Sequence, residues 1–198
     1  MSRAGPIAAG VALGQGDDGV PFGTRLQELA REWGDEFAVV SVAPDGSARS
    51  LTFAELEARS NQWGRALAAA GADTGSLVAL AIPNSEHLVL AAMGCWMIGA
   101  VPVPMRWDLP DWERNRLLEV IDPVVILDEE HRSELAASAA GQSESPLPVA
   151  VSPMVNGICS SGSTGLPKVI LSLAQALWTP EHSVPFMAQW TPVAQPQT

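Results

Sequence analysis

The sequence predicts an α/β fold in which helices flank a mainly parallel sheet. Short apolar segments rich in Val and Ile alternate with longer segments of helical periodicity, as expected for β-α-β units. Parallel strands need a crossover of about a dozen residues, and the helical segments are long enough to supply it. The chain has 198 residues, of which 47% are hydrophobic, so it can bury a core without disulfides.

The first part of the chain is expected to hold a leader, a helix and a β-hairpin. Residues 1–23 are rich in Gly and lack periodicity, which predicts a flexible leader before a domain that spans 24–198. Thr24 and Gln27 form a capping-box pattern, which predicts that a helix starts at Thr24. The strands expected next are 37–42 and 50–53, around a turn at 44–47.

Caps and breakers predict the remaining elements. Thr52 and Glu55 indicate the start of a long helix that Gly71 ends, and Ser85 is expected to cap a second, strongly apolar helix. Prolines favour extended backbone at the residue before them, so 101–104 is expected to be a strand. The other expected strands are 76–82, 123–127 and 154–160, and the other expected helices are 110–121, 129–140 and 173–178.

The composition excludes several classes of protein. Twenty-two acidic residues outnumber eleven basic ones, whereas a nucleic-acid-binding protein needs a basic face, so we expect no nucleic acid partner. The two cysteines have no histidines at ligand spacing. We therefore expect no metal site and two buried free thiols, as in a cytoplasmic protein. The most apolar segment, 88–101, is too short to span a bilayer, so we expect no transmembrane segment.

The segment Ser160-Ser161-Gly162-Ser163-Thr164-Gly165-Leu166-Pro167-Lys168 carries the clearest chemistry. Its glycines let backbone N–H groups converge on an anion, and its hydroxyls can donate to phosphate oxygens. Lys168, the only lysine in the chain, adds a positive charge. Because the segment follows an apolar strand, it predicts a phosphate-binding loop. The alternative is an ordinary Ser/Gly surface turn.

Three better-known motifs do not account for this loop. A Walker loop needs Gly directly before the lysine, where this chain has Pro167. Neither the Gly-x-Ser-x-Gly nucleophile elbow nor Ser-x-x-Lys occurs there. A G-x-G-x-x-G match at 14–19 would place two aspartates where a pyrophosphate binds, so we reject it as a dinucleotide site.

Residues 160–168 resemble the signature phosphate loop of the AMP-forming adenylate superfamily, which includes acyl-CoA synthetases, luciferases and peptide-synthetase adenylation domains. The family pattern is a hydroxyl residue, Ser-Gly, two hydroxyl residues, Gly, any residue and Pro-Lys, and every position fits. The family usually has Gly after the lysine, where this chain has Val169. Three further segments, 51–56, 78–85 and 99–104, resemble the family in their order and spacing.

The resemblance implies part of the large N-terminal domain of an acyl-CoA synthetase-like enzyme and a two-step reaction. A carboxylic acid attacks the α-phosphate of ATP to give an acyl-adenylate and pyrophosphate, and coenzyme A then takes the acyl group. The resemblance also implies Mg²⁺ with ATP, and a bulky hydrophobic acid such as a fatty, aromatic or steroid acid. A fatty acid substrate would imply a role in fatty acid metabolism. The residues implied to hold the β- and γ-phosphates are Ser160, Ser161, Gly162, Ser163, Thr164, Gly165 and Lys168.

The chain departs from the family in what it lacks. The family needs a Tyr-Gly-x-Thr-Glu segment and a second lysine on a mobile C-terminal domain, but this chain has no Tyr and one Lys. We therefore expect a domain truncated after the phosphate loop, inactive alone and without a catalytic residue of its own. The alternatives are a non-catalytic module that binds ATP, polyphosphate or a partner, and an α/β fragment without activity.

Overall fold

The computed structural model describes residues 8–9, 19–43, 45–160, 168–172 and 174–179. The helices in these residues are α1 Phe22–Glu32, α2 Phe53–Ala69, α3 Glu86–Ile98, α4 Asp111–Ile121 and α5 Arg132–Ala140. The strands are β1 Ala8–Ala9, β2 Val20–Pro21, β3 Phe37–Val42, β4 Ala48–Thr52, β5 Leu77–Ala81, β6 Val101–Pro104, β7 Val125–Asp128, β8 Gly157–Ser160, β9 Lys168–Leu171 and β10 Leu177–Trp178.

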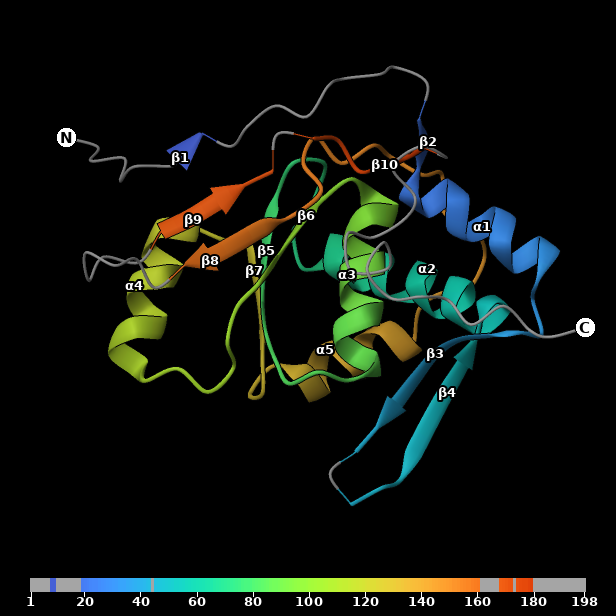
Figure 1. Ribbon diagram of the computed structural model, residues 1–198, viewed down its shortest axis with the longest axis horizontal. Coiled ribbons are helices and arrows are strands. Elements are labelled where there is room, and N and C mark those ends of the chain that lie inside the picture. The colour runs from blue at the N-terminus through green and yellow to red at the C-terminus, as the bar shows by residue number, and fades with distance from the viewer. Residues whose placement is uncertain (1–7, 10–18, 44, 161–167, 173, 180–198) are drawn as a thin grey trace, which may run out of the picture.

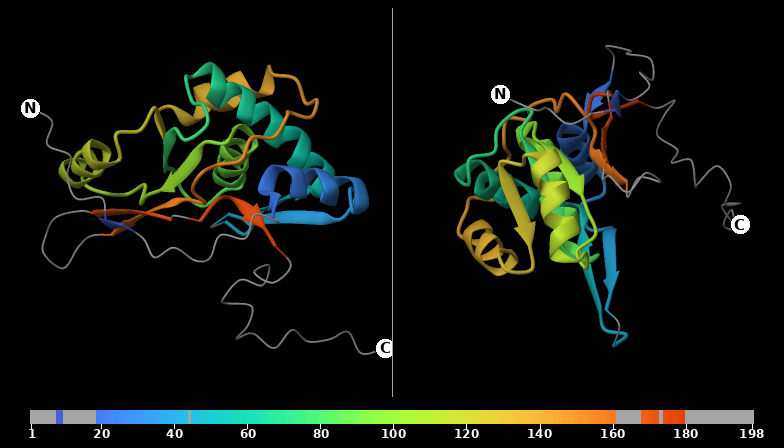
Figure 2. Two further views of the ribbon diagram at one scale, coloured as in Figure 1. Left: turned by 90° about the horizontal axis from the view of Figure 1, so that it is seen from above. Right: turned by 90° about the vertical axis from the view of Figure 1, so that its left-hand side faces the viewer.

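A parallel sheet in the strand order β6-β5-β7 lies at the centre of the molecule (Figure 1). The helices α2, α3 and α5 pack on one face of this sheet. The helix α4 packs on the other face, together with the antiparallel hairpin β8–β9. The view from above shows this hairpin on the side of the sheet opposite α2 and α5 (Figure 2). The expected α/β fold, a parallel sheet with flanking helices, is therefore confirmed.

The alternating side chains of β5 and of the residue after it divide the interior into two cores. Val78, Leu80 and Ile82 belong to the first core, with α2, α3 and α5, and each is at most 3% exposed. Ala79 and Ala81 belong to the second core, with α4 and β9. Successive side chains of a strand point to opposite faces, so large residues fill one face and alanines the other. The alanines leave room for α4 and the hairpin to approach the sheet closely.

The caps predicted for the two long central helices are present. Thr52 Oγ1 accepts a hydrogen bond from Glu55 N at 3.2 Å, and Glu55 Oε2 accepts one from Thr52 N at 2.9 Å. Ser85 Oγ accepts a hydrogen bond from Leu88 N at 3.4 Å. Gly99 follows α3 with φ of 78°, a left-handed conformation that favours glycine. Local sequence therefore sets where α2 and α3 begin, and where α3 ends.

The first helix begins earlier than the sequence predicted. α1 starts at Phe22, after Pro21, and no side chain caps it. Gln27, expected in a capping box with Thr24, instead donates from Nε2 to the backbone oxygen of Leu147 at 3.2 Å. The capping-box prediction was wrong because a contact with a distant segment uses the side chain that the local pattern requires.

The helix predicted over 173–178 is absent from the described residues of that segment. Leu177–Trp178 form β10, which pairs antiparallel with Val20–Pro21 of β2. A segment of this length is too short to form a stable helix alone, so pairing with the distant β2 decides its conformation.

The leader predicted over 1–23 is not irregular throughout. Besides β2 and the start of α1, it contains Ala8–Ala9, which pair in parallel with Ile170 and Leu171 of β9. The remaining leader residues, 1–7 and 10–18, lie outside the described residues and include most of the rejected G-x-G-x-x-G match.

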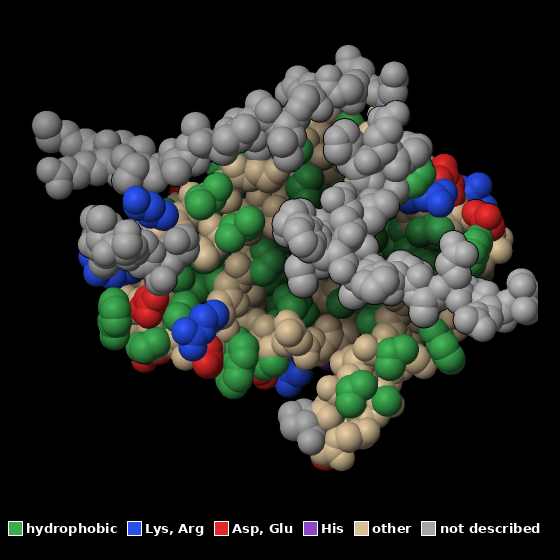
Figure 3. Space-filling view, in the orientation of Figure 1, with side chains coloured by type: hydrophobic (Ala, Val, Ile, Leu, Met, Phe, Trp, Pro, Cys, Tyr) green, Lys and Arg blue, Asp and Glu red, His purple; other side chains and the backbone are tan. Residues whose placement is uncertain are grey.

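The hairpin β3–β4 projects from the body of the molecule (Figure 1). A shift of register between Phe37 and Val39 marks a bulge in β3. The bulge brings Phe37 onto the same face as Val40 and Val42, and these side chains are 69%, 60% and 67% exposed. Apolar side chains are visible on this hairpin in the space-filling view (Figure 3).

No helix in the described residues is long and apolar enough to cross a membrane.

The helices α2 and α3 touch at two glycines. A Cβ added at Gly94 would lie 2.9 Å from the backbone nitrogen of Gly64 and 3.0 Å from Trp63 Cβ. Backbone cannot move aside as a flexible side chain can, so this crossing excludes larger residues. The close approach lets α3 lie between α2 and β5 and bury its Leu90 and Ala91 completely.

We expect Gly94→Ala to lower the free energy of unfolding by about 2 kcal/mol, because the added methyl forces α2 and α3 apart. The higher helix propensity of Ala offsets only part of this cost. Thermal or urea unfolding measures the change. The matched control is Gly141→Ala, where the nearest atom to the added Cβ is Ser138 O at 3.5 Å. Equal stability of Gly94→Ala and the control would contradict the close crossing.

Candidate functional site

The hairpin β8–β9 carries both ends of the predicted phosphate loop. Ser160 ends β8 and Lys168 begins β9, and the two residues are partners in the antiparallel register. Lys168 is partly buried. The predicted loop residues between them, Ser161, Gly162, Ser163, Thr164 and Gly165, lie outside the described residues. The structure therefore brings the first and last predicted site residues side by side.

The hairpin lies directly against the central sheet. A Cβ at Gly157 would be 3.0 Å from both methyl carbons of Val103 in β6 and 3.2 Å from Leu171 Cδ2. Glycine at this position therefore allows β8 to lie close to β6. On the second strand of the hairpin, Val169 is 3% exposed and belongs to the second core. Packing against the sheet thus fixes the strand on each side of the loop.

A cavity of about 560 Å³ opens at the carboxyl edge of the parallel sheet, beside β8. α3 follows β5 on one face of the sheet, whereas α4 follows β6 on the other face. The cavity lies where these two connections diverge, which is the position at which open parallel sheets bind ligands. Its walls are Leu80, Ile82, Asn84, Leu88, Pro104, Met105, Arg106, Trp107, Leu109, Glu113, Leu117, Asn156, Gly157, Ile158 and Cys159.

The cavity is mainly apolar, with a few polar groups. Asn84 follows β5, Arg106 follows β6, and Glu113 comes from α4. The guanidinium of Arg106 donates two hydrogen bonds to the Asp108 carboxylate, at 3.0 and 2.9 Å. Such a lining suits a ligand with an apolar body and a polar end.

The cysteines contribute no nucleophile to this site. Cys159 lines the cavity, and burial raises the pKa of its thiol to about 11, so the thiol stays protonated at neutral pH. Cys95 is completely buried in the first core, where burial also raises its pKa. Both cysteines are free, as the sequence predicted, but only Cys95 is fully buried, whereas Cys159 is partly buried.

Asp128 joins three elements at the carboxyl edge. Its Oδ1 accepts a hydrogen bond from His131 N at 3.0 Å and lies 2.7 Å from His131 Nδ1, while Oδ2 accepts one from Arg114 of α4. Burial alone would raise the pKa of Asp128, but the hydrogen bonds from His131 and the charge of Arg114 lower it overall. The hydrogen bond to Asp128 raises the pKa of His131. These contacts connect β7 with α4 and with the start of α5.

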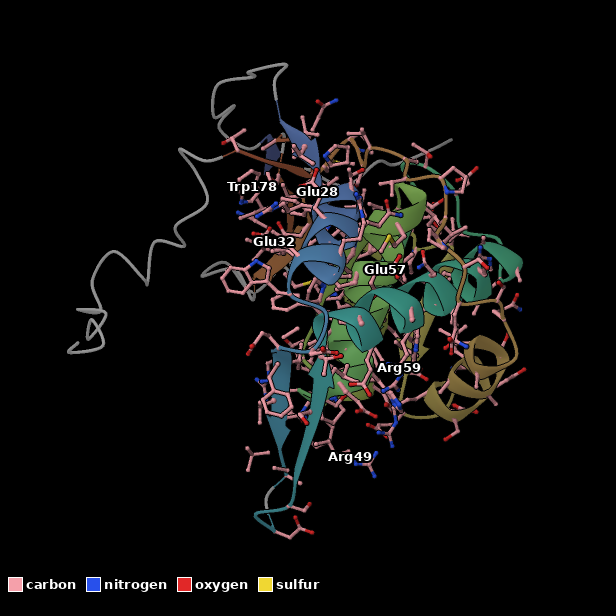
Figure 4. All side chains as sticks on the ribbon, turned by 90° about the vertical axis from the view of Figure 1, so that its right-hand side faces the viewer. Glu28, Glu32, Arg49, Glu57, Arg59 and Trp178 are labelled. Atoms are coloured by element: carbon pink, nitrogen blue, oxygen red, sulfur yellow. The ribbon has the colours of Figure 1, made fainter. Side chains whose placement is uncertain are left out.

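A second group of charges surrounds Glu86, the first residue of α3. Arg49 of β4 and Arg59 of α2, labelled in Figure 4, each place a nitrogen 3.5 Å from Glu86 Oε1. Burial lowers the pKa of the neighbouring His87, whose ring lies 5.6 Å from the ring of Trp63. These ion pairs join β4, α2 and α3. None of the residues in this group lines the cavity.

Sequence reasoning did not identify the residues at the ends of the parallel strands. Asn84 and Arg106 each follow a predicted strand, and that position was the available signal. Asp128, at the end of β7, is only 7% exposed because Arg114 and His131 cover it. Among the residues that the structure describes, no group of three or more His, Cys, Asp or Glu could hold a metal ion.

Comparisons with known proteins agree on one family. The family model described as AMP-binding enzyme matches residues 26–190. The 3-hydroxybenzoate–CoA ligase of Aromatoleum sp. (strain CIB) is 31% identical over 173 residues, covering 72% of this chain and 32% of that protein. Tyrocidine synthase 3 of Brevibacillus parabrevis is 30% identical over 142 residues, covering 63% of this chain and 2% of that protein.

The solved structures show the same fold. The crystal structure of an acyl-CoA synthetase from Brucella canis superposes with a TM-score of 0.66 at 22% identity, covering 78% of this chain and 33% of that one. The chain thus has an acyl-CoA synthetase-like fold and spans a third or less of the length of these relatives.

We expect the Asp128–His131 contact to make stability depend on pH. A raised folded-state pKa of His131 stabilises the fold below its unfolded value of 6.5, and this contribution is lost as the pH rises through the raised pKa. The lowered pKa of Asp128 stabilises the fold above 3.8, and that contribution is lost as the pH falls through the lowered pKa.

The two melting temperatures of wild type and His131→Gln should therefore differ most at about pH 5–6 and converge above about pH 8. Thermal unfolding over a pH series measures this difference. The control Glu119→Gln removes an exposed charge on α4, and its difference from wild type should show no such maximum. A pH-independent difference for His131→Gln would rule out the ionic contact.

Proposed function

The chain belongs to the AMP-binding enzyme family, and from this we propose that it supplies the triphosphate site of an enzyme that joins a carboxylic acid to AMP. The observation that carries the proposal is the pairing of Ser160 with Lys168 at the end of a hairpin that packs against β6. This pairing supports a phosphate-binding role for 160–168 because it holds the first and last of the proposed residues next to each other.

In this proposal, the residues of the loop bind the β- and γ-phosphates of ATP. The hydroxyl groups of Ser161, Ser163 and Thr164 and the backbone N–H groups at Gly162 and Gly165 donate to phosphate oxygens. Lys168 supplies the positive charge. Because the chain has a net charge of −11, free ATP would be repelled, and Mg²⁺ bound to ATP reduces that repulsion.

The proposed reaction is a displacement at the α-phosphate. A carboxylate oxygen attacks the α-phosphorus, the bond to the bridging oxygen breaks, and pyrophosphate leaves with the negative charge. Holding the β- and γ-phosphates stabilises this charge as it develops, and Lys168 contributes to that stabilisation. The part of this chain in the reaction is to bind and orient the leaving group.

We extend the proposal to coenzyme A as the acceptor of the acyl group. Its thiol would attack the carbonyl carbon of the acyl-adenylate, lose its proton and release AMP. The name of the 3-hydroxybenzoate–CoA ligase supports this choice, whereas the name of tyrocidine synthase 3 does not mention coenzyme A. The substrate that we propose is a bulky hydrophobic acid, such as a fatty, aromatic or steroid acid, in a cytoplasmic enzyme.

We also propose that the 198 residues bind Mg-ATP without completing the reaction. The chain holds one lysine, Lys168, and the proposal places it on the polyphosphate. No second lysine is then available among these residues to reach the reacting carboxylate and phosphate.

We expect the purified chain to bind Mg-ATP and inorganic triphosphate, and Lys168→Met to weaken both affinities about tenfold, the usual effect of losing a hydrogen bond to a charged group. Isothermal titration calorimetry measures the affinities. The matched control is Arg116→Met, which removes a positive charge from the exposed face of α4 and should bind as wild type does.

Pyrophosphate release with a panel of carboxylic acids tests the proposed inactivity of the chain. We expect no release above the rate without acid. Turnover by the 198 residues would contradict the inactivity. Absence of ATP and triphosphate binding, or equal binding by Lys168→Met, would contradict the phosphate-binding role.

A further inference from the structure

We propose that Trp96 is a positioning residue, whose indole N–H fixes the hairpin that carries Ser160 and Lys168. Trp96 lies on α3 and donates from Nε1 to the backbone oxygen of Val155 at 2.8 Å. Val155 lies just before β8, so this bond joins α3 to the root of the hairpin, by which we mean residues 155, 156, 172 and 174. Its functional meaning rests on the proposed role of the loop in phosphate binding.

The indole is itself held in place by a neighbouring ring. Trp96 meets Phe22, at the start of α1, edge to face, with ring centroids 5.0 Å apart and an interplanar angle of 83°. Aromatic pairs favour this arrangement, so the contact restricts the direction in which the indole N–H points. The contact with Phe22 therefore orients the indole N–H for its hydrogen bond to the carbonyl oxygen of Val155.

The hydrogen bond from Trp96 to Val155 is made where backbone hydrogen bonds connect the two sides of the hairpin. Val155 N donates to Ala174 O at 2.8 Å, and Ser172 N donates to Asn156 O at 3.0 Å. The N–H of Val155 therefore bonds to the segment that follows β9, while its carbonyl oxygen bonds to α3. A movement of Val155 would displace both strands of the hairpin.

The chain after β9 ties the same root to α1. Ala176 N donates to Ser152 O at 3.1 Å, and Phe22 N donates to Ala176 O at 3.0 Å. At the end of this segment, the guanidinium of Arg25 lies 4.5 Å from the ring centre of Trp178, which Figure 4 shows beside α1. The root is therefore anchored to α1 as well as to α3.

One face of the hairpin is open, and the other face packs on the second core. Ile158 of β8 is 56% exposed and Ile170 of β9 is 39% exposed, so one face of the hairpin is open. The opposite face meets β6 at Gly157 and places Val169 in the second core. A two-stranded hairpin is marginal alone, and within the described residues β1 adds just Ala8–Ala9 beside β9. From Val155 to Ser160 the strand extends about 17 Å, so a small tilt at the root moves Ser160 and Lys168 appreciably.

The test removes the indole N–H and follows the hairpin in the full chain. Trp96→Phe removes the donor and keeps an aromatic ring against Phe22. Site-specific incorporation of 3-benzothienylalanine at position 96 keeps the bicyclic shape and removes only the N–H. The matched control is Trp112→Phe, because Trp112 is 61% exposed on α4 and does not line the cavity.

We expect backbone amides of 155–160 and 168–172 to exchange with deuterium about fivefold faster in both position-96 variants, the effect of losing one hydrogen bond. Exchange in β5 and β7 should stay as in wild type. Because Lys168 is the only lysine, its acylation by an amine-reactive reagent can be followed by mass spectrometry. The rate of this acylation should rise together with the rate of amide exchange. Mg-ATP affinity should fall by a similar factor.

A general loss of stability would instead accelerate exchange throughout the molecule. Unchanged exchange of the hairpin and unchanged Lys168 acylation in the benzothienylalanine variant would overturn the proposal. So would equal changes in Trp112→Phe. If the wild-type chain binds no ATP or triphosphate, the proposed function fails, whereas exchange and acylation still decide whether Trp96 fixes the hairpin.

Discussion

The burial of β5 on both faces is the constraint on which the rest of the structure depends. Val78, Leu80 and Ile82 need large apolar partners, which α2, α3 and α5 provide. Ala79 and Ala81 occupy little volume, so the second layer must come close to the sheet to fill the space. A single strand therefore specifies two layers of different thickness, and both must form for it to be stable.

The candidate site is a consequence of this asymmetry. α3 and α4 leave the sheet on opposite faces, and this divergence opens the cavity between the ends of β5 and β6. The thin second layer includes β8 and β9, so the strands on both sides of the predicted phosphate loop lie beside that cavity. The position of the loop ends follows from packing on the alanine face, supplemented by the bond from Trp96 to Val155.

Predictions from local patterns succeeded where the partner of a side chain lies within a few residues. Thr52 with Glu55 and Ser85 with Leu88 are such cases, because the capping atoms are neighbours in the chain. The predictions failed where a distant segment of the chain binds the side chain or backbone that the local pattern involves. Gln27 bonds to Leu147, and Leu177–Trp178 pair with β2, although neither partner can be recognised from neighbouring residues.

The sequence by itself determined the α/β class, most of the strands and helices, and the loop chemistry that indicates the family, because periodicity, caps and a contiguous motif are local properties. Only the tertiary structure decided the strand order β6-β5-β7, the cavity at its carboxyl edge, and the burial of Asp128 under Arg114 and His131. It also assigned Trp96, one of seven tryptophans, to the root of the hairpin. These features join residues far apart in the chain, and their free energies depend on packing that no local pattern encodes.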